Sequence, residues 1–520
     1  MIPGSYERWI TQYDTLTPAA RAALVAEELR LTRRPVFSIL LPVYNPHLEW
    51  LQQAIDSVKA QTWSRWELCI ADDASTEPGV RPFLKAQAQS DARIKLVFRA
   101  ANGHISACSN SALALARGEW CALLDQDDVL APHALSLVAR EINAFPNAGL
   151  IYSDEDFLEP SGARLNPFLK PDWNAELFLA QNYLNHLGVY RADLLRGIGG
   201  FREGFEGSQD YDLALRCIER LQPEQIRHVP RVLYHWRMVP GSLAEVRDAK
   251  PYAKDAARRA LREHLERRGI IACVEPCPES PESHRVRFSA SAASHEVLVC
   301  DGGAAALNEA ANTSRADVMI FVGAQIEIDD ASVAEMVSQA QRRELGAVGA
   351  RVWSSAGTLV SGGIVLGLGG LWSEAHAGVP RGHAGFFNST ILQRNCCAVS
   401  ATCLAVRREV FRELGGFDES NLKRRYHDVD FCLRARERGL QIVWTPYANL
   451  IALNQLGSEP SPEDERYMRS RWGTQLTSDP FYNPALSLEL PGFELSFPPR
   501  WSERHRILPR STPNTLSRGS

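Results

Sequence analysis

Three carboxylates directly follow an apolar run in residues 121–135, which read CALLDQDDVLAPHAL. The carboxylates of Asp125, Asp127 and Asp128 repel one another and are costly to desolvate, so the pattern favours either solvent exposure or a bound cation. An Asp-x-Asp element supplies the hard oxygen ligands that Mg²⁺ and Mn²⁺ prefer, and such a metal offsets charge on a departing diphosphate. Taken alone the motif is weak evidence, because a solvated acidic loop has the same composition.

Apolar strands alternate with helices around this motif. Leu51, Ile55 and Val58 fall on one face of a predicted helix, and an Ala-rich helix is expected near 106–117. Continuous apolar segments predict the strands FSILLPV (37–43), WELCIADD (66–73), IKLVF (94–98) and WCALLD (120–125). This alternation predicts an α/β fold with a mostly parallel sheet flanked by helices, whose ligands lie beyond the carboxyl ends of the strands.

Polar residues stand where three of these strands stop. They are Pro42-Val43-Tyr44-Asn45 after the first strand, Asp72-Asp73 after the second, and Asp125-Gln126-Asp127-Asp128 after a later one. Because the carboxyl ends of parallel strands meet at one edge of a sheet, we expect these groups to line one crevice.

The bulk properties exclude several classes of protein. The chain has 520 residues and a formal net charge of −5, which provides no basic field for nucleic acid. No apolar run approaches the roughly 20 residues that span a bilayer, and MIPGSYERWITQYD lacks the layout of a signal peptide. Eleven cysteines without a C-x-x-C pair indicate buried, reduced thiols and a cytoplasmic location. Cys273 with Cys277, and Cys396 with Cys397, lack zinc-ligand spacing.

A series of motifs identifies a family. SILLPVYNP, ELCIADDAST, ANGHISACSNSALALARGEW, ALLDQDDVL, GGFREGFEGSQDYDLALR and VLYHWR occur in this order. Together they resemble the family 2 glycosyltransferases of the GT-A fold, over about residues 36–245. The resemblance implies a nucleotide-diphospho-sugar transferase fold and a Mn²⁺ or Mg²⁺ cofactor.

The resemblance assigns the donor-binding residues position by position. Pro42, Tyr44 and Asn45 match the loop beside the nucleotide, and Asp72 and Asp73 match acids that face the base and ribose. Carboxylates suit this role because they only accept hydrogen bonds. A capped turn before a helix is the alternative for these residues.

The catalytic residues follow in the same way. Asp125 and Asp127 match the metal and diphosphate motif, with Asp127 the more direct ligand, and His235 matches a position where His can complete the metal site. Arg237 is placed to pair with a phosphate. Asp210 resembles the catalytic base, although Gln209 replaces the Glu that usually precedes it. A structural His235 and a helix-terminal Asp210 remain alternatives.

One more acidic run has two interpretations. Asp154-Glu155-Asp156, after LIYS, either lines the sugar or acceptor pocket or forms a solvated turn.

The implied reaction is an inverting transfer from a nucleotide-diphospho-sugar to a hydroxyl of a glycan or lipid-linked acceptor, in the style of cell-surface polysaccharide synthesis such as O-antigen, capsule or exopolysaccharide. One alternative is a sugar-phosphate nucleotidyltransferase, but PVYNPHLEW replaces the Gly-rich phosphate loop that it needs. Another is a non-catalytic nucleotide- or glycan-binding scaffold. The donor's base and sugar, the linkage and the oligomeric state are left open.

The second half repeats the first without its acids. LNEAANTSRADVMIFVGAQIEIDD (307–330) aligns with SNSALALARGEWCALLDQDDVLAP at an offset of 198, which places Asn308 over Asn110. Gly323, Ala324 and Gln325 then replace the Asp-Gln-Asp motif. Asp428 stands at the base position, where it is expected to be an inherited structural residue, with an unusual metal-independent site as the alternative. Only 23 positions separate Arg285 from Asn308, against 72 from Ser38 to Asn110, so the copy is truncated.

These observations divide the chain. The expected parts are a helical lead-in (1–34), a catalytic glycosyltransferase domain (35–270), a Pro- and Ser-rich linker (271–294), a degenerate transferase-like domain (295–490) and a disordered tail (491–520). Peripheral contact with the inner face of the plasma membrane is an open alternative to a purely cytoplasmic location.

Overall fold

The computed structural model describes residues 4–238, 251–290, 292–300, 302–454 and 461–507, which form two compact units. The first unit comprises Ile2–Lys170, Leu184–Ala257 and Phe497–Ser520, and the second comprises Pro171–Tyr183 and Arg258–Ser496. Each unit has its own large sheet and hydrophobic core.

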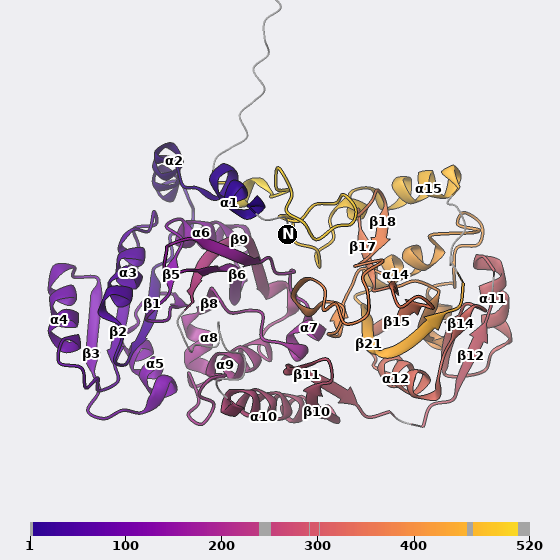
Figure 1. Ribbon diagram of the computed structural model, residues 1–520, viewed down its shortest axis with the longest axis horizontal. Helices are drawn as coiled ribbons and strands as arrows, with labels where there is room; N and C mark the ends of the chain where they lie inside the picture. Colours follow the sequence, from indigo (N-terminus) through magenta and orange to yellow (C-terminus); the bar gives the residue numbers. More distant parts are fainter. Residues whose placement is uncertain (1–3, 239–250, 291, 301, 455–460, 508–520) are drawn as a thin grey trace, which may run out of the picture. The chain divides into compact units, whose positions relative to one another are not determined.

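The sheet of the first unit runs in the order β3-β2-β1-β4-β8-β6-β9-β5, with β7 paired to β6 (Figure 1). Its parallel part confirms the expected strands: β1 (Phe37–Val43), β2 (Trp66–Asp72), β3 (Ile94–Phe98) and β4 (Trp120–Leu123). The remaining strands are β5 (Val129–Leu130), β6 (Leu150–Leu158), β7 (Arg164–Phe168), β8 (Gly188–Arg191) and β9 (Ile226–Arg237). Strand β8 is antiparallel to β4 and β6, so the sheet is mixed.

Burial on both faces explains why β1 and β2 read as continuous apolar runs. Leu51, Ile55 and Val58 of α3 (Leu48–Lys59) are fully buried against this sheet, as their spacing predicted. The other helices of this unit are α4 (Val80–Ser90), α5 (His104–Leu115), α6 (Ala134–Ala144), α8 (Ala192–Gly197) and α9 (Gln209–Ile218). Helix α10 (Pro251–Arg267) crosses the boundary between the units.

The lead-in forms helices α1 (Ser5–Trp9) and α2 (Pro18–Glu28), joined by a π-helical turn at Ile10–Asp14. Thr17 caps α2 by accepting the N–H of Ala20, with proline in the first turn. Asp14 is buried between the guanidinium groups of Arg164 (2.7 Å) and Arg231 (2.6 Å), which hold its pKa below the usual range although burial opposes them. The lead-in is therefore anchored to the first unit by ion pairs.

The second unit has a sheet in the order β12-β13-β20-β15-β21-β14, with β16 and β19 at its margins. Its strands are β12 (His295–Val299), β13 (Val318–Val322), β14 (Ile326–Glu327), β15 (Leu345–Ser354), β16 (Leu359–Ser361), β19 (Arg394–Asn395), β20 (Cys403–Arg407) and β21 (Gln441–Ala452). A separate pair is formed by β17 (Ile364–Leu366) and β18 (Trp372–Glu374). The helices are α7 (Ala175–Ala180), α11 (Ala304–Thr313), α12 (Asp330–Ala340), α13 (Arg408–Glu413), α14 (His427–Glu437) and α15 (Pro462–Trp472).

This second sheet repeats the path β1-β4-β8-β6-β9-β5 strand for strand. The directions also agree: the first two strands of each path are parallel, the next two pairings are antiparallel, the fourth is parallel and the last is antiparallel. Counterparts of β2 and β3 are missing from the described part of this sheet. The truncation expected from the short spacing before Asn308 thus corresponds to the two strands at one end of the first sheet.

Side-chain bonds repeat as well as strands. Asn110 donates to the carbonyl of Phe201 (2.8 Å) and accepts its N–H (2.8 Å), and Asn308 makes the same two bonds with Phe417 (both 2.9 Å). In each pair the phenylalanine follows a glycine of positive φ. A Cβ atom added to that glycine would lie within 3 Å of the side-chain oxygen of the asparagine. The offset of 198 read from the sequence therefore aligns structurally equivalent residues.

Two expectations about the connecting segments are wrong. Residues 271–294 are not an irregular linker, because β10 (Ala272–Cys277) and β11 (Ser280–Phe288) form a hairpin there. The tail is ordered as far as residue 507, with Trp501, His505 and Ile507 buried, while 508–520 lie outside the described residues. Residues 239–250, inside the predicted domain 35–270, also lie outside them.

Among the residues that are described, none of the helices has both the length and the apolar character that a membrane crossing requires.

The repeated asparagine bonds generate a paired prediction. Asn110→Ala leaves the N–H and C=O of Phe201 without these partners and should lower the local free energy of unfolding by about 2 kcal/mol. Asn308→Ala should do the same in the second unit. Hydrogen exchange followed by mass spectrometry should show faster exchange near residue 201 in one variant and near 417 in the other, and exchange unchanged at both would contradict the equivalence.

Candidate active site

The ends of three parallel strands bring the predicted site residues to one edge of the first sheet. Val43 at the end of β1 lies opposite Asp72 at the end of β2, and Leu40 lies opposite Leu123 at the end of β4. Pro42 itself lies within β1, opposite Ala71. The loops that follow β1, β2 and β4 therefore start side by side.

Gln126 joins two of these loops. Its side-chain oxygen accepts the N–H of Tyr44 (2.9 Å), and its side-chain nitrogen donates to the carbonyl of Tyr44 (3.3 Å). The ring of Tyr44 stays 45% exposed, which is unusual for a large aromatic side chain at a buried strand end. The middle residue of the Asp-Gln-Asp motif thus fixes the loop after β1 against the loop after β4.

Asn45 holds the loop after β2. Its Oδ1 accepts the N–H of Thr76 (2.8 Å) and of Glu77 (3.2 Å), and its own N–H donates to Ser75 Oγ (2.9 Å). Its φ of 41° lies in the left-handed region that asparagine tolerates better than most residues. The described contacts of Asn45 are those of a loop organiser, and its predicted nucleotide contact stays a prediction.

The two acids after β2 differ in their surroundings. Asp73 is committed to the protein, because it accepts the N–H of Gly103 (3.1 Å) and pairs with Arg99 Nε (2.7 Å). Asp72 is fully buried, and its Oδ2 accepts the N–H of Ser75 (3.3 Å). Its Oδ1 receives no hydrogen bond from the part of the chain that the structure describes.

Two of the three carboxylates after β4, those of Asp128 and Asp125, have different surroundings. Asp128 is buried and accepts bonds from the Tyr234 hydroxyl (2.6 Å) and the Arg237 N–H (2.8 Å), which fasten the loop to β9. Burial, with Asp127 and Asp125 nearby, raises the pKa of Asp128 well above its ordinary value. The side chain of Asp125, in contrast, is 45% exposed.

Arg237 supports the same loop from β9. Its Nε donates to the carbonyl of Asp127 (2.7 Å) and its Nη2 to Gln53 Oε1 (2.6 Å), and the residue is only 4% exposed. The guanidinium therefore braces the Asp127 backbone, and the predicted pairing with a phosphate stays a prediction.

His235 is oriented by a buried acid. Its Nδ1 lies 2.6 Å from Asp156 Oδ1, and the other oxygen of Asp156 accepts the Tyr6 hydroxyl (2.6 Å) and Arg164 Nε (2.6 Å). A carboxylate on one ring nitrogen is the usual way in which a metal-binding histidine is held. Through Tyr6, helix α1 takes part in this support.

Asp154, Glu155 and Asp156 lie in the buried strand β6, so the interpretation as a solvated turn is wrong. Asp154 Oδ1 accepts the N–H of Lys170 (2.8 Å) and lies 2.9 Å from His228 Nε2. Glu155 instead faces His186, which the sequence did not single out.

His186 links Glu155 to the acid loop. Its Nδ1 lies 3.0 Å from Glu155 Oε2, its Nε2 lies 3.8 Å from Asp125 Oδ2, and its ring stacks on Tyr234 at 4.6 Å. Burial disfavours the imidazolium, but the hydrogen bond and charge of Glu155, with Asp125 and Asp128, outweigh it and raise the pKa of His186 to about 9. A cation at neutral pH thus faces the acid loop.

Asp210 stands in the first turn of α9 and is half-buried. Its Oδ2 accepts a bond from the side-chain nitrogen of Asn185 (2.6 Å), the residue directly before His186. Consecutive residues therefore contact Asp210 and Asp125, which brings the predicted base and the predicted metal motif into one site. Neither Asn185 nor His186 stands in a motif, so no pattern in the sequence points to them.

The donor set is compatible with a divalent cation that is completed by substrate. In the described regions, groups of three or more His, Cys, Asp or Glu side chains that could hold a metal ion are absent. Mg²⁺ is commonly held by one or two carboxylates together with substrate phosphates. Asp125 and Asp127, which are both partly exposed, supply two such carboxylates in the loop after β4.

Comparison with known families decides the identity of this unit. Residues 38–196 match the model of glycosyl transferase family 2. This region is a family 2 glycosyltransferase domain. The glycosyltransferase domain has the α/β GT-A fold, as the order of its motifs implied.

Relatives extend over nearly the whole chain. The chain is 40% identical to the uncharacterized protein y4gI of Sinorhizobium fredii, over 96% of this chain and 62% of that protein. It is 31% identical to the O-antigen biosynthesis protein RfbC of Myxococcus xanthus, over 93% of this chain and 42% of that protein. The chain therefore spans less than two thirds of the length of either relative. The solved structure of S. aureus TarS with UDP-GlcNAc is 19% identical, covering 44% of this chain and 66% of that chain, with a TM-score of 0.37.

The second unit keeps the frame of this site without its acids. Gly323, Ala324 and Gln325 stand between β13 and β14, where the glycosyltransferase domain has Asp125 to Asp127. Asp428 stands at the start of α14, as Asp210 does in α9, and its Oδ2 accepts the N–H of Ala401 (2.9 Å).

The environment of His186 generates a prediction about pH. Because the pKa is raised in the folded state, the imidazolium stabilises the fold fully below about pH 6.5, and this contribution is lost as the pH rises through about 9. NMR titration of the folded chain should show one imidazole, absent in His186→Gln, that titrates near pH 9. Titration of that imidazole below pH 6.5 would contradict the contact with Glu155.

Proposed function

We propose that the first unit is an inverting glycosyltransferase, which moves a sugar from a nucleotide-diphospho-sugar to a hydroxyl of a glycan or lipid-linked acceptor. The observation that carries the proposal is the joining of Asp210 and Asp125 by the consecutive residues Asn185 and His186. The family 2 match supports sugar transfer, and the likeness to an O-antigen biosynthesis protein supports a role in cell-surface polysaccharide synthesis at the cytosolic side.

The donor occupies the edge formed by the loops after β1, β2 and β4. The exposed ring of Tyr44 lies beside the nucleotide, with Pro42 and Asn45 shaping the loop. Oδ1 of Asp72, which has no hydrogen-bond partner among the described residues, is an acceptor for a base N–H or a ribose hydroxyl once the loop opens to a ligand. Asp73 supports this wall through Arg99.

Asp125, Asp127 and His235 would hold Mn²⁺ or Mg²⁺, and Asp156 would fix the ring of His235. When bound, the cation stabilises the negative charge of the departing nucleoside diphosphate. His186 adds a second positive charge beside Asp125 and limits the repulsion among the acids. Arg237 keeps the Asp127 backbone in place.

Asp210 acts as the general base. It removes the proton of the acceptor hydroxyl as that oxygen attacks the anomeric carbon from the face opposite the leaving group, which inverts the configuration. The bond from Asn185 aims the carboxylate. The second unit, whose described residues include neither the metal acids nor counterparts of β2 and β3, is a degenerate domain that does not bind the donor.

Replacement of the base tests the proposal. Asp210→Asn should lower the release of nucleoside diphosphate from the donor in the presence of acceptor by about 10²- to 10⁴-fold, the usual contribution of general-base catalysis. Donor binding should persist, because Asn keeps the shape and the contact with Asn185. Asp428→Asn is the matched control in the second unit and should leave turnover unchanged. Retained turnover in Asp210→Asn would remove that residue from the base role.

The support of His235 gives a separate prediction. Asp156→Asn should weaken Mn²⁺ binding in the presence of nucleotide by about 10- to 100-fold, the usual effect of losing the partner of a metal-binding histidine. Tyr6→Phe removes one neutral donor to the same carboxylate and should have a much smaller effect. Manganese electron paramagnetic resonance measures free Mn²⁺ directly, and equal affinity in Asp156→Asn would show that His235 is no ligand.

A further inference from the structure

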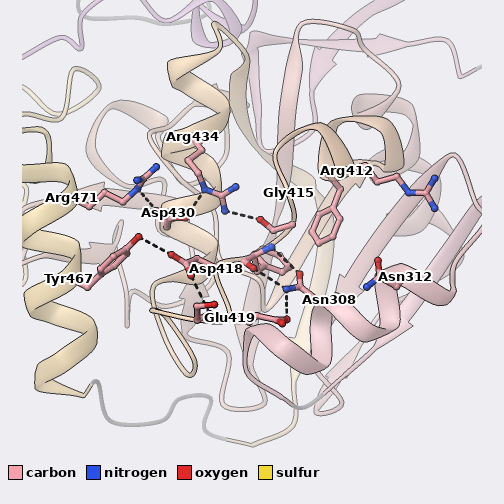
Figure 2. Close-up of a pocket in the computed structure, with 14 residues that line it drawn as sticks. Asn308, Asn312, Arg412, Gly415, Asp418, Glu419, Asp430, Arg434, Tyr467 and Arg471 are labelled. Atoms are coloured by element: carbon pink, nitrogen blue, oxygen red, sulfur yellow. Dashed lines mark hydrogen bonds and ion pairs between the residues drawn. The ribbon is translucent and has the colours of Figure 1, made fainter.

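A polar pocket opens in the second unit, among α11, α13, α14 and α15 (Figure 2). Its volume is about 610 Å³, which is in the range of small-ligand sites. Every residue that lines it belongs to the second unit, so it is a feature of the degenerate domain alone.

The duplicated frame explains why the pocket exists. In the first unit, Arg202 bonds Asp212 (3.1 Å) and packs over the ring of Phe205 (4.2 Å). The motif GGFRE of the first unit corresponds to GGFDE of the second, so the short acid Asp418 replaces Arg202. The counterpart of Asp212 is Asp430. The long side chain that crosses this space in the first unit is absent from the second.

Helix α15 supplies an arginine in place of the one that is lost where Asp418 replaces Arg202. Arg471 of α15 pairs with Asp430 (3.2 Å), and Tyr467 of the same helix donates to Asp418 Oδ2 (2.8 Å). Figure 2 shows both side chains reaching from α15 toward these acids. The buried Asp430 therefore keeps an arginine partner, and the pocket stays open between α15 and α11.

The lining groups are fixed before any ligand arrives. Asn308 donates to Glu419 Oε2 (2.8 Å), and Arg434 holds Asp430 (2.7 Å) and the carbonyl of Gly416 (2.8 Å). Carboxylates held in this way still have lone pairs for a further donor. Arg412 and Asn312 are exposed on the wall, and their side chains bond to none of the described residues.

The charge balance selects the ligand class. Three arginines, Arg412, Arg434 and Arg471, face three acids, Asp418, Glu419 and Asp430, so the pocket has no excess charge for an ion. Its apolar lining side chains, Phe411 and Phe417, are buried and offer little surface to a lipid. Closely spaced donors and acceptors suit a neutral ligand that carries many hydroxyl groups.

We infer that this pocket is a carbohydrate-binding site, which holds a short neutral segment of the glycan that the first unit extends. The identity of that glycan as the acceptor or product rests on the proposed function. The existence of the carbohydrate-binding site does not rest on the proposed function, because the pocket contains none of the residues proposed for donor binding or transfer. The degenerate domain thereby retains substrate while lacking catalysis.

A glycan array tests the inference with the full chain. The probes are purified O-antigen, capsular and exopolysaccharide fragments of defined composition, presented without nucleotide and with a metal chelator. Asn312→Trp obstructs the pocket, and Arg412→Ala removes a donor that bonds to none of the described residues. Both positions are exposed, so the fold should persist. Ala114→Trp is the matched control, because position 114 of α5 corresponds to 312 at the offset of 198.

The wild type, Ala114→Trp and Asp127→Ala should retain the same neutral fragments, and both pocket variants should retain them at least tenfold less. Equal retention by the pocket variants would overturn the inference, as would retention of no fragment by the wild type. Failure of the proposed function would appear elsewhere, as absent donor turnover, since retention on the array requires neither donor nor metal.

Discussion

Crowding of like charges at the end of β4 is the constraint around which the first unit is organised. Asp128 is satisfied by the Tyr234 hydroxyl and the Arg237 N–H, which ties the acid loop to β9. Asp125 is left at the mouth, faced by the protonated His186. Supports for this arrangement come from distant parts of the chain, including Tyr6 of the lead-in through Asp156. Such a loop can bind a cation, and a bound cation can stabilise the charge of a departing diphosphate.

The duplicated sheet shows that the same strand path can be kept without the acids that follow β4. The second unit keeps the strand path, the Asn308 bonds to Phe417 and the pairing of Arg434 with Asp430, all of which stabilise the frame. It has Gly323, Ala324 and Gln325 after β13, and its described residues include no counterparts of β2 and β3. The pocket beside α15 lies where the second unit has Asp418 at the position that Arg202 occupies in the first unit.

The sequence predicted what is locally encoded. Strand β1 begins and ends as expected because burial makes it a continuous apolar run, and the bounds of β3 also agree with the expectation. The sequence did not predict the hairpin of β10 and β11. Both of its strands are edge strands, and an edge strand can contain a proline such as Pro276, which otherwise argues against a strand. The Arg-rich end of the chain was expected to be disordered, but Arg504 and His505 pair with the buried Glu141. Asn185 and His186 act through contacts distant in sequence, which no local pattern records.

The central claim is that one of two similar sheets holds the donor. Calorimetric titration of the full chain with UDP, dTDP and GDP, with and without Mn²⁺, tests it most directly through the stoichiometry. One nucleotide should bind per chain in a metal-dependent manner, and Asp127→Ala should abolish this binding while Gln325→Ala, at the matching position of the second unit, should not. Two sites per chain, or binding that survives Asp127→Ala, would contradict the account.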